Sequence, residues 1–146
     1  MDERVKQLKT PEECENFIRN VKTKYPELAK EARRRKVELL ASVYGAKNAA
    51  EIEALQAIYA YEEVLFARHG RKTYAARTWQ MVKSHGIIGA VERAVNRKDE
   101  TIGFTAVIEM GMLDFAFEAI VVRYPELFSQ EAVARSKQRL EAWTPV

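Results

Sequence analysis

The middle of the chain holds the residues whose types and spacing could do chemistry. Between residues 67 and 98 there are eight basic side chains and one acid, Glu92, which gives this stretch a net charge of +7. The whole chain carries +3, so the remaining residues sum to −4. Lysine and arginine side chains displace counterions from phosphates when they bind a nucleic-acid backbone. This local charge predicts a surface that meets an anionic partner.

Two amphipathic helices are expected in this stretch, residues 72–86 and 87–97, with Gly86 between them. At 100° per residue, the basic side chains of the first helix fall opposite an apolar side that contains Tyr74, Ala75, Thr78, Trp79, Met81 and Val82. In the second helix the expected core stripe is Ile87, Ile88, Val91, Ala94 and Val95, which leaves Gly89, Glu92, Arg93, Asn96 and Arg97 outside. The pair predicts a helix-turn-helix-like unit.

The leading interpretation is a small helical nucleic-acid-binding protein, with DNA favoured over RNA. Arg93 and Asn96 are of the types that read guanine and adenine edges in the major groove. If Gly86 is the turn glycine, Glu92 falls where a standard helix-turn-helix has an apolar residue, so the match is one of geometry and not of family. The predicted nucleic-acid-binding residues are Arg68, Arg71, Lys72, Arg77, Lys83, Arg93, Asn96 and Arg97.

A second interpretation is an α-helical interaction or adaptor subunit whose basic face meets an acidic protein. The apolar segment from Ile102 to Val122 would then bury a homodimer seam instead of an intrachain core. A solvated basic face on a purely structural helix pair also accounts for a charge run. A homodimer therefore stays open at this point.

The candidate catalytic and metal-binding groups are few. His85 could serve as a general base beside Lys83, but it stands directly before a glycine, where a charged residue suits the helix dipole. Asp114 and Glu118 are four residues apart on one expected helix, where they would hold Mg²⁺ or pair with an arginine. The sequence predicts no catalytic residue, no metal site and no cofactor, and favours a protein that is not an enzyme.

The composition places these residues in one ordinary domain. The chain has 146 residues, of which 47% are hydrophobic, and we expect a single helical domain over residues 1–146. The single cysteine, Cys14, and an N-terminus without an apolar leader predict a cytoplasmic protein. Acidic residues interrupt the most apolar stretch, which predicts no membrane span.

The elements that must position the basic residues are all expected to be helices. Apolar residues recur at three- and four-residue intervals, and no segment shows sustained strand alternation. The fold class is therefore all-α, a single compact domain of seven to eight short helices with a central helix-turn-helix-like pair. The expected helices are 11–24, 26–45, 48–68, 72–86, 87–97, 100–110, 111–124 and 130–143.

The sequence writes Tyr-Pro-Glu-Leu twice, at residues 25–28 and 124–127. Proline suits the first position of a helix and disfavours helical backbone at the residue before it. Each copy is therefore expected to be a joint, with Pro26 and Pro125 opening the next helical turn.

Overall fold

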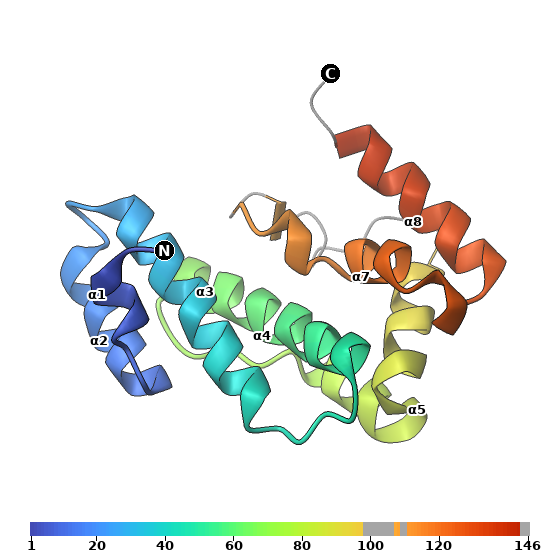
Figure 1. The fold of residues 1–146 in the computed structure, drawn as a ribbon, viewed down its shortest axis with the longest axis horizontal. Coiled ribbons are helices and arrows are strands. Elements are labelled where there is room, and N and C mark those ends of the chain that lie inside the picture. The colour runs from blue at the N-terminus through green and yellow to red at the C-terminus, as the bar shows by residue number, and fades with distance from the viewer. Residues whose placement is uncertain (98–106, 109–110, 144–146) are drawn as a thin grey trace. The chain divides into compact units, whose positions relative to one another are not determined.

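The computed structural model describes residues 1–97, 107–108 and 111–143, and no β-strand occurs among them (Figure 1). The predicted all-α fold class is confirmed. Most of the expected helix over residues 100–110 lies outside the described residues. Those described form α1 (Glu3–Lys6), α2 (Pro11–Val21), α3 (Pro26–Ser42), α4 (Ala49–His69), α5 (Ala76–Val95), α7 (Phe117–Arg123), α8 (Gln130–Trp143) and the 3₁₀ helices η1 (Leu113–Phe115) and η2 (Pro125–Leu127).

The chain divides into two units, Met1–Ala46 and Lys47–Val146. That residues 1–146 form one domain stays a prediction. In the first unit, α1 and α2 pack against α3 around buried residues that include Val5, Ile18 and Ala32. Every predicted nucleic-acid-binding residue belongs to the second unit, so this unit carries the candidate site.

Local capping explains where several helices begin and end. The Thr10 side chain accepts a hydrogen bond from the backbone N–H of Glu13 at 3.1 Å, and Pro11 follows as the first residue of α2. Asn48 caps α4 through the Glu51 N–H at 2.9 Å. Gly70 ends α4 in a left-handed conformation with φ of 70°. These predicted boundaries are confirmed.

Four consecutive basic residues in α3, Arg33 to Lys36, include one that is buried in the first unit. Lys36 is buried, with 4% of its surface exposed, and its ammonium pairs with Glu15 of α2 at 3.1 Å. Arg35 donates to the carbonyl of Leu8 at 3.1 Å. Glu15 of α2 therefore neutralises Lys36, and the carbonyl of Leu8, between α1 and α2, binds Arg35 inside the first unit.

α5 is two helical segments joined at Gly86, as predicted from the sequence. Gly86 has φ of 78° and ψ of 171°, a conformation that is essentially restricted to glycine. The residues before it, from Ala76 to His85, and those after it to Val95 are helical. A β-carbon at Gly89 would lie 3.0 Å from the Cβ of His85, a tight contact that a larger residue would have to relieve by a small shift of His85.

The predicted helix over residues 111–124 is wrong in one respect: it is interrupted. Ala116 adopts an extended conformation, with φ of −70° and ψ of 147°, between η1 and α7. The four consecutive residues 118–121 of α7 are buried, so this short helix is enclosed on several sides and does not bury a single stripe. Its neighbours in the second unit are α4, α5, α8 and the two 3₁₀ helices.

The two Tyr-Pro-Glu-Leu copies are confirmed as joints. Tyr25 and Tyr124 have similar backbone angles, with φ of −132° and −127° and ψ of 70° and 56°, and a helical turn starts at the proline after each. The first copy opens the 17-residue α3. The second yields only η2, because Phe128 returns to an extended conformation before Ser129 caps α8.

No described helix is both long enough and apolar enough to span a membrane.

We expect Gly86→Ala to lower the free energy of unfolding by about 1–3 kcal/mol, because alanine is strained at this φ and ψ although no neighbouring atom blocks its β-carbon. Urea titration of the helical circular-dichroism signal would measure the change. Ser84→Ala, at an exposed position of the same helix, serves as the control and should stay within about 0.5 kcal/mol of the parent. Equal stability of the Gly86 variant and the parent would contradict the left-handed geometry.

Candidate nucleic-acid interface

The seven predicted cationic residues of the candidate site are all exposed. They come from consecutive parts of the second unit: the end of α4, its connection to α5, both segments of α5 and the residues just after it. In chain order they are Arg68, Arg71, Lys72, Arg77, Lys83, Arg93 and Arg97. The structure thus places at the surface every charge that a phosphate would have to reach.

Five of these cations make no ion pair with any residue that the structure describes: Arg71, Arg77, Lys83, Arg93 and Arg97. Arg68 and Lys72 do have partners. Elsewhere, ion pairs engage cations of both units, among them Arg4, Lys6, Lys30, Arg35, Lys36, Arg123 and Arg139. Other exposed cations, among them Lys22, Lys47 and Lys137, also make no ion pair with the described residues, so the basic segment is distinguished by its local net charge.

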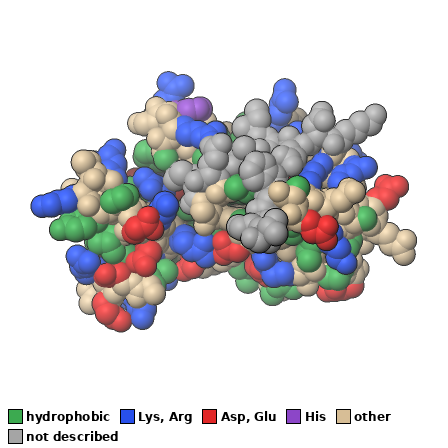
Figure 2. Space-filling view, turned by 90° about the horizontal axis from the view of Figure 1, so that it is seen from above, with side chains coloured by type: hydrophobic (Ala, Val, Ile, Leu, Met, Phe, Trp, Pro, Cys, Tyr) green, Lys and Arg blue, Asp and Glu red, His purple; other side chains and the backbone are tan. Residues whose placement is uncertain are grey.

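The seven cations are spread along the chain from Arg68 at the end of α4 to Arg97 just after α5. Figure 2 shows one face of the molecule, on which lysine and arginine side chains are interspersed with acidic and uncharged ones. An extended, flexible anion can contact such points one after another, whereas a compact anion would meet one or two of them.

Glu62 of α4 fixes the start of α5. Its carboxylate accepts hydrogen bonds from the backbone N–H of Ala75 and from the indole N–H of Trp79, each at 2.7 Å. The Trp79 ring lies against Tyr59 of α4, with ring centroids 5.3 Å apart. The first segment of α5 is therefore held on α4 by its apolar and indole-bearing side, which leaves Arg77 and Lys83 outside.

Tyr74 corrects the sequence-based assignment of the apolar side. It was expected to pack with Trp79, but its side chain is 71% exposed. The reason is that α5 begins at Ala76 and not at residue 72, so Tyr74 precedes the helix and lies outside its periodicity. Other residues predicted on the apolar side of this helix do face the interior: Ala75 and Val82 are buried and Trp79 is half-buried.

Glu92 ties the second segment of α5 to the start of α8. Its carboxylate accepts hydrogen bonds from the backbone N–H and the hydroxyl of Ser129, both at 2.8 Å, and from the side-chain amide of Asn96. Partial burial raises the pKa of Glu92, but these hydrogen bonds outweigh it and hold the pKa below its ordinary value. Glu92, the acid that departs from the helix-turn-helix pattern, thus links α5 to the start of α8 by hydrogen bonds.

Two arginines of α8 bind the carbonyl end of α5. Arg139 donates to the carbonyl of Val95 at 3.0 Å and to that of Arg97, and Arg135 donates to that of Asn96. Arg139 also pairs with Glu118 of α7 at 3.0 Å, and both residues are buried, with 7% and 3% of their surfaces exposed. Cations at the end of a helix oppose the partial negative charge of its unpaired carbonyls.

Asn96 is placed differently from the cations around it. It is half-buried, its amide nitrogen donates to Glu92, and its amide oxygen is buried with no hydrogen-bond partner among the described residues. A side chain held in this way does not reach a base edge. The second segment of α5 also buries Ala90, Val91, Ala94 and Val95, so Arg93 is its one exposed residue between Ile87 and Val95. A helix that reads the major groove needs several exposed side chains on one face.

The other candidate chemical groups are not brought together. Asp114 lies in η1 and Glu118 in α7, so the two carboxylates do not share one helix as the sequence predicted. The predicted alternative for Glu118, a pair with an arginine, is confirmed with Arg139 as the partner. Among the residues that the structure describes, no cluster of three metal-ligating side chains occurs. His85 is exposed, and His69 lies 3.4 Å from the Thr73 hydroxyl.

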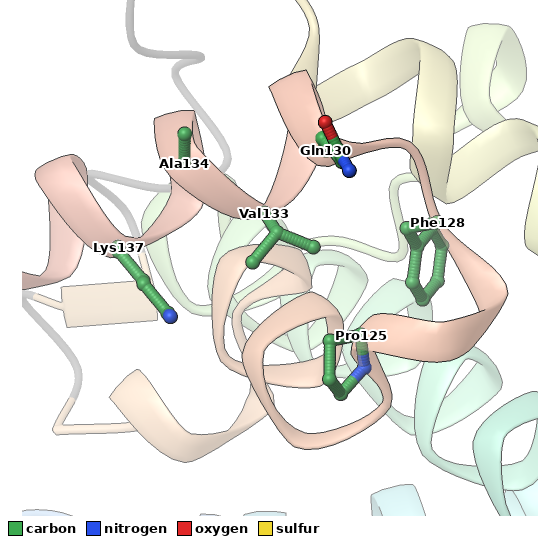
Figure 3. A pocket seen from close by; sticks show the side chains of 6 residues that line it. All are labelled: Pro125, Phe128, Gln130, Val133, Ala134 and Lys137. Atoms are coloured by element: carbon green, nitrogen blue, oxygen red, sulfur yellow. The ribbon is translucent and has the colours of Figure 1, made fainter.

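A shallow hollow of about 350 Å³ lies between the η2 segment and α8. Figure 3 shows Pro125 and Phe128 on one side and Val133, Ala134 and Lys137 on the α8 side. The lining is mostly apolar and includes none of the predicted nucleic-acid-binding residues.

No protein-family model, curated protein or solved structure matches this chain. Its function therefore has to be inferred from its own residues.

We expect Glu92→Gln to be less stable than the parent at neutral pH, by about 1 kcal/mol, because a neutral amide accepts the Ser129 hydrogen bonds less strongly. A carboxyl whose pKa is lowered by folding stabilises the fold above its ordinary value of 4.5, and this contribution is lost as the pH falls through the folded-state pKa. The difference between parent and variant should therefore shrink in acid. Urea titrations across the pH range measure it, with exposed Glu141→Gln as the control. A difference that does not depend on pH would contradict this role.

We expect Arg139→Met to lower the free energy of unfolding by about 3–5 kcal/mol, because it leaves the buried Glu118 carboxylate without its partner. Arg123→Met is the matched control, since the Arg123 to Glu53 pair is partly exposed and its loss should cost about 1 kcal/mol or less. Thermal and urea unfolding of both variants would measure the two costs. Equal costs would show that burial does not set the strength of the Arg139 pair.

Proposed function

We propose that this chain is a small helical nucleic-acid-binding protein, with DNA as the favoured ligand over RNA, that uses the basic segment at residues 67–98. The observation that carries the proposal is the local net charge of this segment together with its five exposed cations that make no ion pair with the described residues: Arg71, Arg77, Lys83, Arg93 and Arg97. Exposed cations without internal partners lose little when a phosphate binds them, because no existing pair has to break.

The mode of binding that the geometry favours is contact with the phosphate backbone. Asn96 is engaged within the protein and Arg93 is nearly alone on the exposed side of its helix, so base-edge readout has little support. Phosphate contacts position a protein on nucleic acid without selecting a sequence. Five such contacts would give a slope of log affinity against log salt of roughly −4 to −5 on duplex DNA and about −3.5 on a single strand.

The alternative is an adaptor whose basic surface meets an acidic protein, because the same cations would serve it. One part of that alternative, a homodimer seam in the segment from Ile102 to Val122, gains no support from the described residues of this segment. Within the described part of that segment, Val107, Met112, Phe115 and Ile120 are already buried in the chain's own structure. The adaptor reading therefore depends on the cations alone.

We expect the double variant Arg93→Glu/Arg97→Glu to lose most of its affinity for nucleic acid at low salt while its helical signal is retained, because both side chains are exposed. Fluorescence anisotropy with labelled oligonucleotides, repeated over a series of salt concentrations, measures the affinity and its salt slope.

The matched control is Lys6→Glu/Lys30→Glu, which changes the net charge by the same amount at cations of the first unit that are already paired, one exposed and one partly exposed. It should bind nearly as well as the parent. Absence of binding to DNA and RNA at low salt would reject the proposal, and equal losses in the two double variants would reject the assignment to the basic segment. Salt-sensitive binding to an acidic protein, with none to nucleic acid, would establish the adaptor instead.

A further inference from the structure

Tyr74 is the most exposed large apolar side chain described in the second unit, with 71% of its surface accessible, compared with 44% for Leu127 and 39% for Ile52. A tyrosine ring contributes most when its faces are covered, and tyrosine is common where a partner covers one. No hydrogen bond or ring contact engages the Tyr74 side chain among the described residues. Its ring is therefore free on the surface.

The backbone that carries this ring is held on both sides. Before it, the N–H of Gly70 donates to the carbonyl of Phe66 at 2.8 Å and closes α4. After it, the N–H of Ala75 donates to Glu62 at 2.7 Å, and the Ala75 side chain is buried. The exposure of Tyr74 is thus fixed by its neighbours and is not that of a loose chain end.

Two of the unpaired cations flank the ring in sequence. Arg71 and Arg77 each lie three residues from Tyr74, so their Cα atoms lie at most about 11 Å from its own. Both are exposed and make no ion pair with the described residues. An aromatic face beside free guanidinium groups is the combination that binds single-stranded nucleic acid, in which bases stack on the ring and phosphates meet the cations.

The choice between single and double strands follows from the geometry of stacking. In a duplex the faces of the bases are covered by neighbouring bases, and a protein reads their edges through the grooves. A surface ring such as that of Tyr74 can stack only on a base that is unpaired or exposed at an end. The second segment of α5, in contrast, offers little of the exposed side-chain row that groove reading needs.

We propose that Tyr74 is the base-stacking residue of a single-strand binding site that it forms with Arg71 and Arg77. This inference rests on the proposed nucleic-acid-binding function and names its ligand class, an unpaired strand. Stacking and phosphate contact are shared by DNA and RNA, so both sugars belong in the test.

The test compares the binding of oligothymidylate and oligouridylate, each about 15 nucleotides long, with that of a duplex of the same length. Fluorescence anisotropy gives the affinities of the full chain and its variants. We expect tighter binding to the single strands. Tyr74→Ala should weaken single-strand binding roughly tenfold, which corresponds to the loss of one stacked base, and Tyr74→Phe should keep it within about twofold. The ratio of the two single-strand affinities identifies the preferred sugar.

The matched control is Tyr25→Ala, which removes a 51% exposed ring from the first unit and should leave binding unchanged. Circular dichroism confirms that each variant keeps its helices. Equal affinities for duplex and single strand, or an unchanged affinity in Tyr74→Ala, would overturn the stacking site while the nucleic-acid-binding function stands. Absence of binding to every oligonucleotide would overturn both.

Discussion

The guanidinium of Arg139 is the group on which the second unit most depends. It lies almost fully buried on α8, where it binds the Glu118 carboxylate of α7 and two carbonyls at the end of α5. A buried guanidinium is tolerated only when its donors are satisfied, so these contacts fix the three helices relative to one another. Glu92 adds the reverse contact, from α5 to the first residues of α8. Side chains from within α8 therefore bind the carbonyl end of α5, while Glu92 of α5 binds Ser129 at the start of α8.

The internal contacts of the second unit also explain its basic surface. Several of its acids are used as acceptors inside the unit: Glu118 for Arg139, Glu92 for Ser129, Glu62 for Ala75 and Trp79, and Glu53 for Arg123 and Tyr124. The hydrogen bond to Glu53 raises the pKa of Tyr124, because it favours the protonated phenol. In these contacts the carboxylates of Glu118, Glu92 and Glu62 do not pair with an exposed arginine, whereas Glu53 pairs with the exposed Arg123.

The sequence predicted helix boundaries that depend on neighbouring residues, and it missed features that depend on contacts between residues far apart in the chain. The helix starts near residues 11 and 48 and the break at Gly86 were predicted, because helix starts and glycine conformations depend on a few adjacent residues. The Arg139 contacts join residues 21 and 44 positions apart, and no local pattern signals them. The sequence predicts Tyr74 on the apolar side because the predicted helix begins at residue 72, four residues before α5 begins at Ala76. The Glu62 contact that sets this start comes from α4, 13 residues away.

The exposure of Tyr74 also depends on a contact between distant residues, the one that Glu62 makes at the start of α5. Glu62 of α4 accepts hydrogen bonds from the backbone N–H of Ala75 and the indole N–H of Trp79. These bonds hold Trp79 against α4 and place the start of α5 after Tyr74, which is left exposed. Because the connection is anchored at Gly70 and Ala75, binding a ligand at Tyr74 would require little further ordering of the backbone. Preorganisation of this kind lowers the entropic cost of association, which matters most for a site built from one ring and a few separate cations.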